Sequence, residues 1–308
     1  MRIGSAVLHY RFWPGIRATL EALVSQTRAP DLIVVVDNDS RDGSVSELGR
    51  AFPGVEVLEA GENRGYGAGM NIGIARLLAQ GADAVLLLTH ECLLDPEAVE
   101  ALVGRLEEDP AVGVVGPLLG DLNRPDAVYS AGGQIDQRTW KTAHLRVPEL
   151  MDDWREASPR RVEWLDGAAL LIRADALRAG AKIDEEYFMY FEETEYQLKL
   201  RELGWPIECV PAARAWQRSS GKPPYLWTRN RLRFVSRTAP NRLLAREIVR
   251  LTRSLVRDGL HGGSGAERAV RRARRRGLVD FLFRRWGPDP SALEQPRSFR
   301  ARDEARPA

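Results

Sequence analysis

The sequence predicts an α/β fold with a mostly parallel central sheet flanked by helices, followed by a basic helical appendage at the C-terminus. Short runs rich in Val, Ile and Leu alternate with segments whose apolar residues recur at helical spacing. Strands separated by helices of this length favour βαβ units and a parallel sheet. The charge distribution indicates the appendage: residues 1–213 hold 21 Lys and Arg against 35 Asp and Glu, whereas residues 214–308 hold 24 against 8.

The individual elements follow in chain order. Apolar runs predict strands at residues 3–8, 32–36, 55–58, 84–88 and 112–119. Helical spacing predicts helices at residues 14–26, 44–51, 69–80, 96–108 and 193–203. Residues 121–161 are irregular and indicate loops and short strands over one mouth of the sheet, before apolar order resumes at 162–172. Because ligands of such sheets bind at the carboxyl ends of the strands, a site is expected after residues 36 and 88.

Composition excludes several classes of protein. A chain of 308 residues that is 44% hydrophobic and 29% charged is neither disordered throughout nor fibrous. Cys92 and Cys209 lie far apart and form no CxxC pair, which excludes a disulfide scaffold and a structural zinc site. The longest apolar runs are far shorter than the roughly 18 residues that cross a bilayer, and the N-terminus lacks a signal-peptide pattern. We therefore expect a cytoplasmic protein.

Polar side chains end the second predicted strand, in the segment VVVDNDSRDGS at residues 34–44. The side chains of Asp37 and Asn38 could accept hydrogen bonds from a nucleotide's base and ribose. An ordinary polar turn, with Asp42 or Ser44 capping the next helix, explains the same residues equally well.

Glycines dominate the segment ENRGYGAGMNIGI at residues 62–74. Such a segment lets the backbone approach a ligand closely and direct N–H groups at an anion. It matches neither the dinucleotide fingerprint nor the nucleoside-triphosphate loop. Close packing of a helix is an equally good explanation.

The fourth predicted strand delivers Thr89, His90 and Glu91 to the edge where ligands bind. A carboxylate beside an imidazole could hold a hard divalent ion that bridges a diphosphate. His90 could instead be a neutral hydrogen-bond donor or a packed side chain.

Aromatic residues precede a group of carboxylates, Glu192, Glu193 and Glu195, in the first turn of a predicted helix. The helix dipole stabilises their ionised form. Burial and like charges raise the pKa of a carboxylate, so a tuned base could stand here. Charge compensation at a helix N-terminus is the simpler explanation.

Taken together and in this order, these segments resemble the family 2 glycosyltransferases, in particular the rhamnosyltransferase-like branch with the GT-A fold. The matching pieces are VLHY, VVVDNDSRDGS, NRGYGAGMNIG, LLLTHE, GAALLIR and FMYFEETEYQLKLRELGW, and they span roughly residues 1–235. The resemblance implies a GT-A domain at residues 1–220, with a nucleotide-sugar half (1–120) and an acceptor half (121–220). We expect the basic appendage at 221–290 and a disordered tail at 291–308.

The resemblance also implies roles for individual residues. Glu193 would be the catalytic base, and Glu91, with His90, would bind a divalent metal, Mg²⁺ or Mn²⁺. Trp164, Asp166 and Glu192 would lie on the acceptor side. The residues implied for the nucleotide-sugar donor are His9, Tyr10, Asp37, Asn38, Asn63, Gly65 and Asn71.

The implied reaction is an inverting transfer of a sugar, such as rhamnose or another deoxysugar, from a nucleoside diphosphate to a hydroxyl of a glycan or lipid-linked acceptor. Transfer to a soluble secondary metabolite and a non-catalytic nucleotide-sugar binder are the alternatives. Three departures from the family pattern keep the second alternative open: Thr89-His90-Glu91 replaces Asn-Pro-Asp, Glu replaces Asp at 193 and 195, and Gln217 stands where many relatives carry His.

Arginines mix with apolar residues at helical spacing in residues 226–260. Such a helix could lie on an anionic membrane surface, as expected of a peripheral enzyme of cell wall biogenesis on the inner face of the membrane. It could equally pack back on the domain with its arginines in solvent. Arg229-Asn230 resembles a pair common in this branch. No nucleic-acid-binding module is visible, so we expect no nucleic-acid partner.

Overall fold

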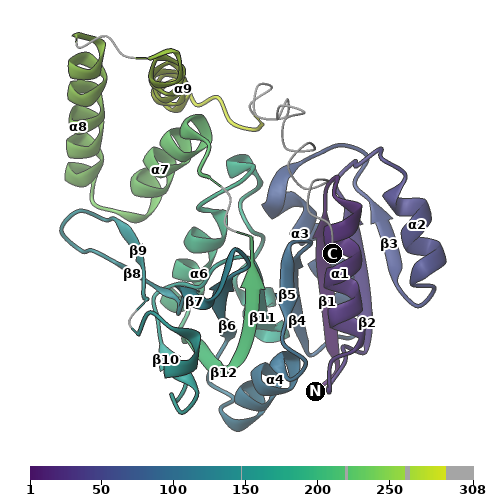
Figure 1. Ribbon diagram of the computed structural model, residues 1–308. Coiled ribbons are helices and arrows are strands. Elements are labelled where there is room, and N and C mark those ends of the chain that lie inside the picture. Colours follow the sequence, from purple (N-terminus) through teal and green to yellow (C-terminus); the bar gives the residue numbers. More distant parts are fainter. Residues whose placement is uncertain (147, 219–220, 261–263, 289–308) are drawn as a thin grey trace.

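The computed structural model describes residues 1–146, 148–218, 221–260 and 264–288 (Figure 1). The predicted tail at 291–308 lies outside the described residues. The predicted α/β fold is confirmed: most strands belong to one sheet of ten strands with helices on both faces.

The first half of the sheet is parallel, as predicted. Its strands run in the spatial order β3-β2-β1-β4. Their bounds are β1 (Ile3–His9), β2 (Leu32–Asp37), β3 (Glu56–Glu59) and β4 (Ala84–Thr89). Since parallel neighbours end together, β1, β2 and β4 present their last residues along one edge.

The second half of the sheet is mixed. Strand β11 (Ala169–Arg173) runs antiparallel between β4 and β6 (Val114–Asp121), and β12 (Ile207–Gln217) is parallel to β6. The strand β12 was not predicted. The smaller strands at its margins are β5 (Cys92–Leu94), β7 (Arg124–Ser130) and β10 (Arg160–Arg161), and β8 (Gly133–Ile135) and β9 (Thr142–His144) form a separate hairpin. The expected loops and short strands of residues 121–161 are thus observed.

Alternate side chains of the strands pack against two layers of helices, one on each face of the sheet. Ile3 and Val7 of β1 pack in one core with apolar residues of α1 (Trp13–Val24), α2 (Ser44–Ala51) and α4 (Ala98–Glu108). Ala6 and Leu8 point the other way, into a core with α3 (Gly65–Ala79), α5 (Ala174–Ala179) and α6 (Glu192–Glu202). This period of two is what places a helix layer on each face.

Three helices follow the sheet: α7 (Pro224–Thr238), α8 (Asn241–Leu260) and α9 (Gly265–Leu282). Figure 1 shows them grouped beside the β8–β9 hairpin. Helix α7 packs against α6, α8 and α9, and its Arg229 and Asn230 are 0% exposed. The arginines in the middle of α7 are therefore neither solvated nor available to a membrane. A division at 220/221 into domain and appendage stays a prediction.

Candidate active site

The carboxyl ends of three parallel strands bring the predicted donor residues together. In the sheet register His9 lies beside Asp37, and Leu8 lies beside Thr89. The residues after these strands, Tyr10, Asn38 and Glu91, consequently share one edge of the molecule. The sequence prediction that the ends of the strands before 37 and 89 form a common site fits this arrangement.

Two neutral imidazoles occupy this edge. His9 Nε2 lies 2.8 Å from Ser44 Oγ, and its ring meets that of His90 edge to face at 5.4 Å. Burial lowers the pKa of His9 to about 4, with His90 contributing. Burial also lowers the pKa of His90, whose Nδ1 is 3.1 Å from the Leu8 carbonyl oxygen and 3.3 Å from the Tyr10 amide. Only the Nε2 of His90 is left for any metal.

Asp37 and Asn38 are both buried and hold backbone in place. Asp37 accepts hydrogen bonds from the Ser40 amide, at 3.1 Å, and from the Ser40 hydroxyl. Asn38 donates to the Gly65 carbonyl at 3.0 Å. Tyr10 is partly exposed, with the Arg11 guanidinium 4.9 Å from its ring centre. Of these predicted donor residues, Tyr10 therefore offers the most accessible side chain.

The glycine-rich segment packs closely as a helix. Helix α3 begins at Gly65, four residues earlier than predicted, and a Cβ on Gly65 would lie 2.0 Å from the Phe188 carbonyl oxygen. Asn63 accepts from the Gly65 amide at 3.1 Å, and Asn71 exchanges two hydrogen bonds with the backbone of Ile183. In this structure Asn63, Gly65 and Asn71 position backbone, and the glycines admit the segment that leads to Glu193.

Glu193 combines access with an altered acidity. It stands in the first turn of α6, partly exposed, with its Cγ 3.3 Å from where a Cβ on Gly167 would be. Burial raises the pKa of Glu193 to about 7, and the charge of Asp166 adds to the rise. The neighbouring Glu192 is 2% exposed, and burial together with the Glu193 charge raises its pKa well above the usual range. The upward shift expected for this group of carboxylates thus occurs at Glu192 and Glu193 only. At Glu195 burial acts to raise the pKa, but hydrogen bonds from Lys199, Tyr187 and Arg237 lower it.

Asp166 lies between Glu193 and a group of polar aromatic residues. Its Oδ1 is 3.7 Å from His144 Nδ1, and its buried Oδ2 has no hydrogen-bond partner among the described residues. Trp164 is only 4% exposed and packs edge to face on His144 at 5.0 Å. Two acceptor-side predictions, Asp166 through Oδ2 and Glu192 through Oε2, thus have a buried oxygen without a hydrogen-bond partner among the described residues. Trp164 supports the wall behind Asp166.

Residues 166–168 lie between the strand that leads to Glu91 and the helix that carries Glu193. The Thr89 amide donates to the Ala168 carbonyl at 3.0 Å, which ties the strand leading to Glu91 to this segment. The same segment contacts Glu193 at Gly167. Gln217, at the end of β12, pairs in register with Cys92, the residue after Glu91. Residues 166–168 therefore lie next to both the end of β4 and the first turn of α6.

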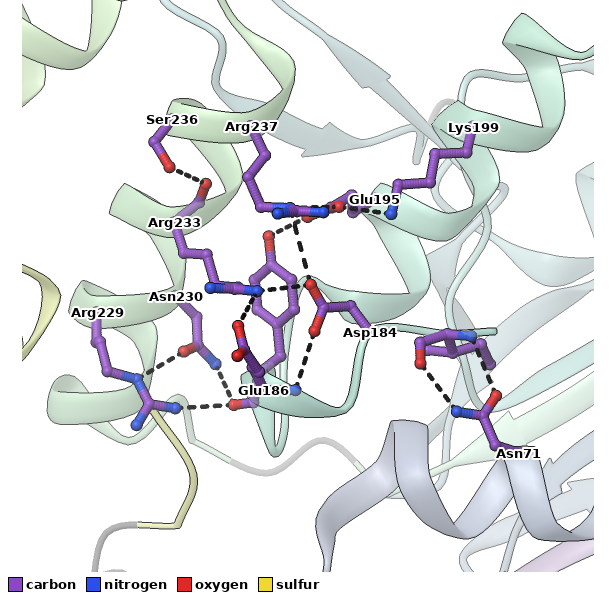
Figure 2. A network of polar contacts seen from close by, with 12 residues as sticks. Asn71, Asp184, Glu186, Glu195, Lys199, Arg229, Asn230, Arg233, Ser236 and Arg237 are labelled. Atoms are coloured by element: carbon purple, nitrogen blue, oxygen red, sulfur yellow. Dashed lines mark hydrogen bonds and ion pairs between the residues drawn. The ribbon is translucent and has the colours of Figure 1, made fainter. Parts of the chain in front are cut away.

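The turn before Glu193 is clamped by α7 (Figure 2). Phe188, Tyr190 and Phe191 have φ of +67°, +79° and +78°, a conformation that costs free energy for residues other than glycine. Asn230 donates its amide to the carbonyls of Tyr187, Met189 and Tyr190 at 2.7–3.1 Å. Arg229 donates to the Tyr187 carbonyl at 2.9 Å. These bonds supply the partners that hold the turn in this shape.

Ion pairs extend the clamp to both sides of the turn. Arg233 contacts Asp184 at 2.7 Å, and Arg237 contacts Glu195 at 2.8 Å (Figure 2). Glu195 also accepts from Lys199 and from the Tyr187 hydroxyl. Sequence reasoning missed Arg233 and Arg237 as supports of the site. The signal was arginine at every fourth position, 229, 233 and 237, facing the acidic run 184–186.

Lys222 and Tyr66 were also missed. Tyr66 donates to the Gly167 carbonyl at 2.8 Å, and its pKa is raised by burial and by the charges of Glu193 and Glu192. Burial lowers the pKa of Lys222, while Asp166 and Glu193 oppose the change. The ammonium group of Lys222 and the phenol of Tyr66 therefore both interact with the Glu193 charge.

The comparisons with known proteins identify the chain as a glycosyltransferase with the GT-A fold. Residues 6–150 match the family model described as Glycosyl transferase family 2. The chain is 30% identical over 239 residues to the N-acetylglucosaminyl-diphospho-decaprenol L-rhamnosyltransferase of Mycobacterium tuberculosis, over 68% of this chain and 75% of the relative. The chain belongs to glycosyl transferase family 2, and its resemblance to the rhamnosyltransferase-like branch is confirmed.

Further similarities agree with this assignment. The galactofuranosyltransferase GlfT1 of M. tuberculosis is 29% identical over 213 residues, 68% of each chain. Among solved structures, the mannosyltransferase PcManGT from Pyrobaculum calidifontis in complex with GDP-Man and Mn²⁺ superposes with a TM-score of 0.56 at 14% identity, over 92% of this chain and 88% of that one. GalNAc-T7 with UDP, GalNAc and Mn²⁺ gives 0.60 at 16% identity, over 77% and 48%. These two likenesses show the fold.

Proposed function

We propose that this glycosyltransferase carries out an inverting transfer of a sugar, rhamnose or another deoxysugar, from a nucleoside diphosphate donor to a hydroxyl of a lipid-linked glycan. The names of the two mycobacterial relatives support this choice, since one transfers L-rhamnose to a diphospho-decaprenol-linked sugar and the other is a galactofuranosyltransferase. The observation that carries the proposal is Glu193, a partly exposed carboxylate with a pKa near 7 at the edge where β1, β2 and β4 end.

Glu193 acts as the general base in this proposal. An acceptor hydroxyl attacks the anomeric carbon from the face opposite the diphosphate, and Glu193 takes the hydroxyl proton. The bond between the anomeric carbon and the diphosphate oxygen breaks, and the nucleoside diphosphate leaves. A base works best when its pKa lies near the operating pH, because it is then largely deprotonated and still basic enough to accept a proton. Asp166 and Glu192 would orient the acceptor, and Lys222 would balance the charges of Asp166 and Glu193. Tyr10, Asp37 and the residues around them would hold the nucleotide.

The surroundings of Glu91 offer a divalent ion one carboxylate and one imidazole, which is fewer protein ligands than a complete metal site has. The Glu91 carboxylate is partly exposed and receives no hydrogen bond from any described residue, and within the described ranges no group of three metal-binding side chains occurs. Mg²⁺ commonly binds one or two carboxylates and completes its shell with substrate phosphates and water. Glu91, with His90 through Nε2, would thus hold the ion only together with the donor. When bound, such an ion neutralises charge on the diphosphate.

A peripheral place on an anionic membrane would bring the enzyme to a lipid-linked acceptor. No helix in the described part of the chain combines the length and the apolar character that crossing a bilayer requires. Helix α8, however, exposes Arg242, Arg246 and Arg253 beside Val249 and Val256. A helix with this composition binds anionic lipid surfaces through its arginines and inserts its apolar side chains shallowly. We place the enzyme on the cytoplasmic face, in the assembly of a cell-surface glycan.

Donor consumption tests the proposed function. Wild-type protein, Glu193→Gln and the matched control Glu202→Gln, an exposed residue at the end of the same helix, are incubated with a panel of nucleoside diphosphate sugars and membrane lipid extract. We expect one donor to be consumed, with turnover lower by about 10²- to 10⁴-fold in Glu193→Gln and unchanged in Glu202→Gln. Binding without turnover in the wild type would favour a non-catalytic binder. Transfer to soluble acceptors alone would favour the secondary-metabolite alternative.

A further inference from the structure

A groove of about 310 Å³ lies between the C-terminal helices and the β8–β9 hairpin. Helix α7 contributes Trp227, Arg231 and Leu232 to it, α8 contributes Leu251, and α9 contributes Arg274. Lys141, at the start of β9, closes the remaining side. The groove is separate from the residues assigned above to the donor and to the base.

The groove has an excess of positive charge. Arg231 and Arg250 share the carboxylate of Glu247, at 3.8 and 2.6 Å, and Arg274 lies 3.5 Å from Asp258. The ammonium group of Lys141 is exposed and makes no hydrogen bond or ion pair with any described residue, while its charge acts on Glu247. The lining residues thus include four cations against one carboxylate. An anion with more than one negative charge matches this surplus.

Apolar side chains line the same groove. Leu232 and Leu251 are almost fully buried in its walls, and Trp227 adds an indole face. A free inorganic anion uses none of this surface, whereas a phosphate group attached to an apolar chain uses both kinds of lining. The chemistry therefore favours an amphiphilic phosphate ester.

Trp227 links the groove to the active site. Its ring packs on that of Phe191 at 4.6 Å, directly before Glu192 and Glu193, and Lys222 Nζ lies 3.9 Å from the centre of the same ring. Lys222 in turn interacts with the charges of Asp166 and Glu193. A ligand whose charged part occupies the groove can therefore extend a sugar past Trp227 toward the base.

We propose that this groove binds the diphosphate of the lipid-linked acceptor, with Lys141 and Arg274 contacting the phosphates and the partly exposed Trp227 contacting the start of the lipid chain. This inference rests on the proposed function and adds to it a location for the acceptor. A phospholipid headgroup has related chemistry, so the experiment must separate the two sources.

Binding of farnesyl diphosphate, measured by calorimetry, tests the groove. The variants are Lys141→Glu, Lys141→Glu with Arg274→Glu, and the matched control Lys182→Glu, an exposed lysine outside the groove. We expect Lys141→Glu to weaken binding by about tenfold and the double variant by more, because each change replaces an attraction with a repulsion. Lys182→Glu should bind like the wild type. Farnesyl diphosphate bound at the donor residues would contribute equally in all variants. Differences between the variants therefore report on binding in the groove.

Flotation with phosphatidylglycerol vesicles provides the second arm. If the groove takes the acceptor, vesicle binding by Lys141→Glu stays within about twofold of the wild type, since α8 keeps its exposed arginines. Equal farnesyl diphosphate binding by Lys141→Glu and Lys182→Glu would overturn the proposal, and so would loss of vesicle binding alone. The readout is binding, so a protein that binds through Lys141 yet transfers no sugar would contradict the proposed function and leave the groove intact.

Discussion

Asn230 on α7 donates its side-chain amide to the Tyr187 carbonyl at 2.9 Å, across 43 residues of sequence. The same amide also reaches the Met189 and Tyr190 carbonyls. A turn with three non-glycine residues at positive φ therefore depends on a helix that contributes nothing directly to the predicted chemistry. The turn ends where α6 begins, so Asn230 fixes the starting point of the helix that carries Glu193.

Asn230→Ala should slow turnover while leaving donor affinity nearly unchanged. The substitution removes the partners of the turn and lets Glu193 shift, and a misplacement of about 1 Å can cost on the order of 10²-fold in rate. Ser236→Ala on the same helix, which removes only a hydrogen bond to the Arg233 carbonyl, should have no such effect. Steady-state kinetics of both variants provide the measurement. The acidic limb of the Asn230→Ala pH profile should also move down, as Glu193 gains water; an unchanged limb with a normal rate would contradict a positioning role.

Turnover should rise with pH and level off above about 7. Burial and Asp166 raise the pKa of Glu193 to about 7, and only the deprotonated carboxylate can accept the acceptor's proton. Below that pH the rate should fall by about tenfold per unit. The dependence of kcat on pH between 5 and 9, under saturating donor, gives the result. A plateau that continued down to pH 5 would assign the base to a group of ordinary acidity.

The same carboxylate should destabilise the folded protein above neutral pH. The folded pKa of Glu193, about 7, lies above the usual value of 4.5, so the folded state binds more protons between these values and its stability falls as the pH rises through them. Glu193→Gln removes this effect. We expect the variant to be more stable than the wild type at pH 8, by on the order of 1 to 3 kcal/mol, and similar to it near pH 4.5. Urea unfolding at the two pH values measures the difference, and equal stability at pH 8 would speak against a raised pKa of Glu193 in the folded protein.

Metal dependence should be traceable to Glu91. If this carboxylate is the protein's main ligand, Glu91→Ala should need at least about tenfold more Mn²⁺ for half-maximal turnover. Glu97→Ala, an exposed carboxylate six residues later, serves as the control. Mn²⁺ titrations of chelator-treated protein give both values. Identical titration curves for the two variants would place the ion elsewhere, or show that transfer proceeds without one.

The parts of the fold that are predictable from sequence are those set by local periodicity. The first strands and helices lie within about two residues of their predicted bounds, except for α3, because each has an uninterrupted apolar pattern. Strand β12 escaped prediction since Pro211 interrupts it, and its pairing with β6 shifts register between Val210 and Arg214. Helix α3 begins four residues before its predicted start because Gly65 and Gly67 pack against the backbone of Phe188 and Asp184, and such packing cannot be read from one sequence.

The residues of the site also differ in how far the sequence predicts them. The ends of buried strands identify His9, Asp37 and Glu91, and the helix start identifies Glu193. Arginines normally stay in solvent, so the spacing of Arg229 and Arg233 at every fourth position does not by itself predict that both are buried against an earlier turn. The buried Arg229 donates to the Tyr187 carbonyl, and the buried Arg233 pairs with the carboxylates of Asp184 and Glu186, so their burial depends on partners distant in the sequence.

Gly65→Ala should be strongly destabilising and should also impair turnover. Gly65 has a φ of +82°, and an added Cβ would lie 2.0 Å from the Phe188 carbonyl oxygen and 2.7 Å from Phe188 Cα, so α3 and the turn before Glu193 would have to separate. Overpacking of this kind costs about 1–3 kcal/mol or more, to which the strained φ adds. Gly49→Ala in α2 is the matched control, because no atom lies within 4 Å of its added Cβ and alanine favours helix by about 1 kcal/mol. Thermal unfolding should therefore show a lower Tm for Gly65→Ala and an equal or higher Tm for Gly49→Ala. A stable Gly65→Ala variant with reduced donor affinity would instead favour the role in donor binding that the glycine-rich segment suggested in the sequence.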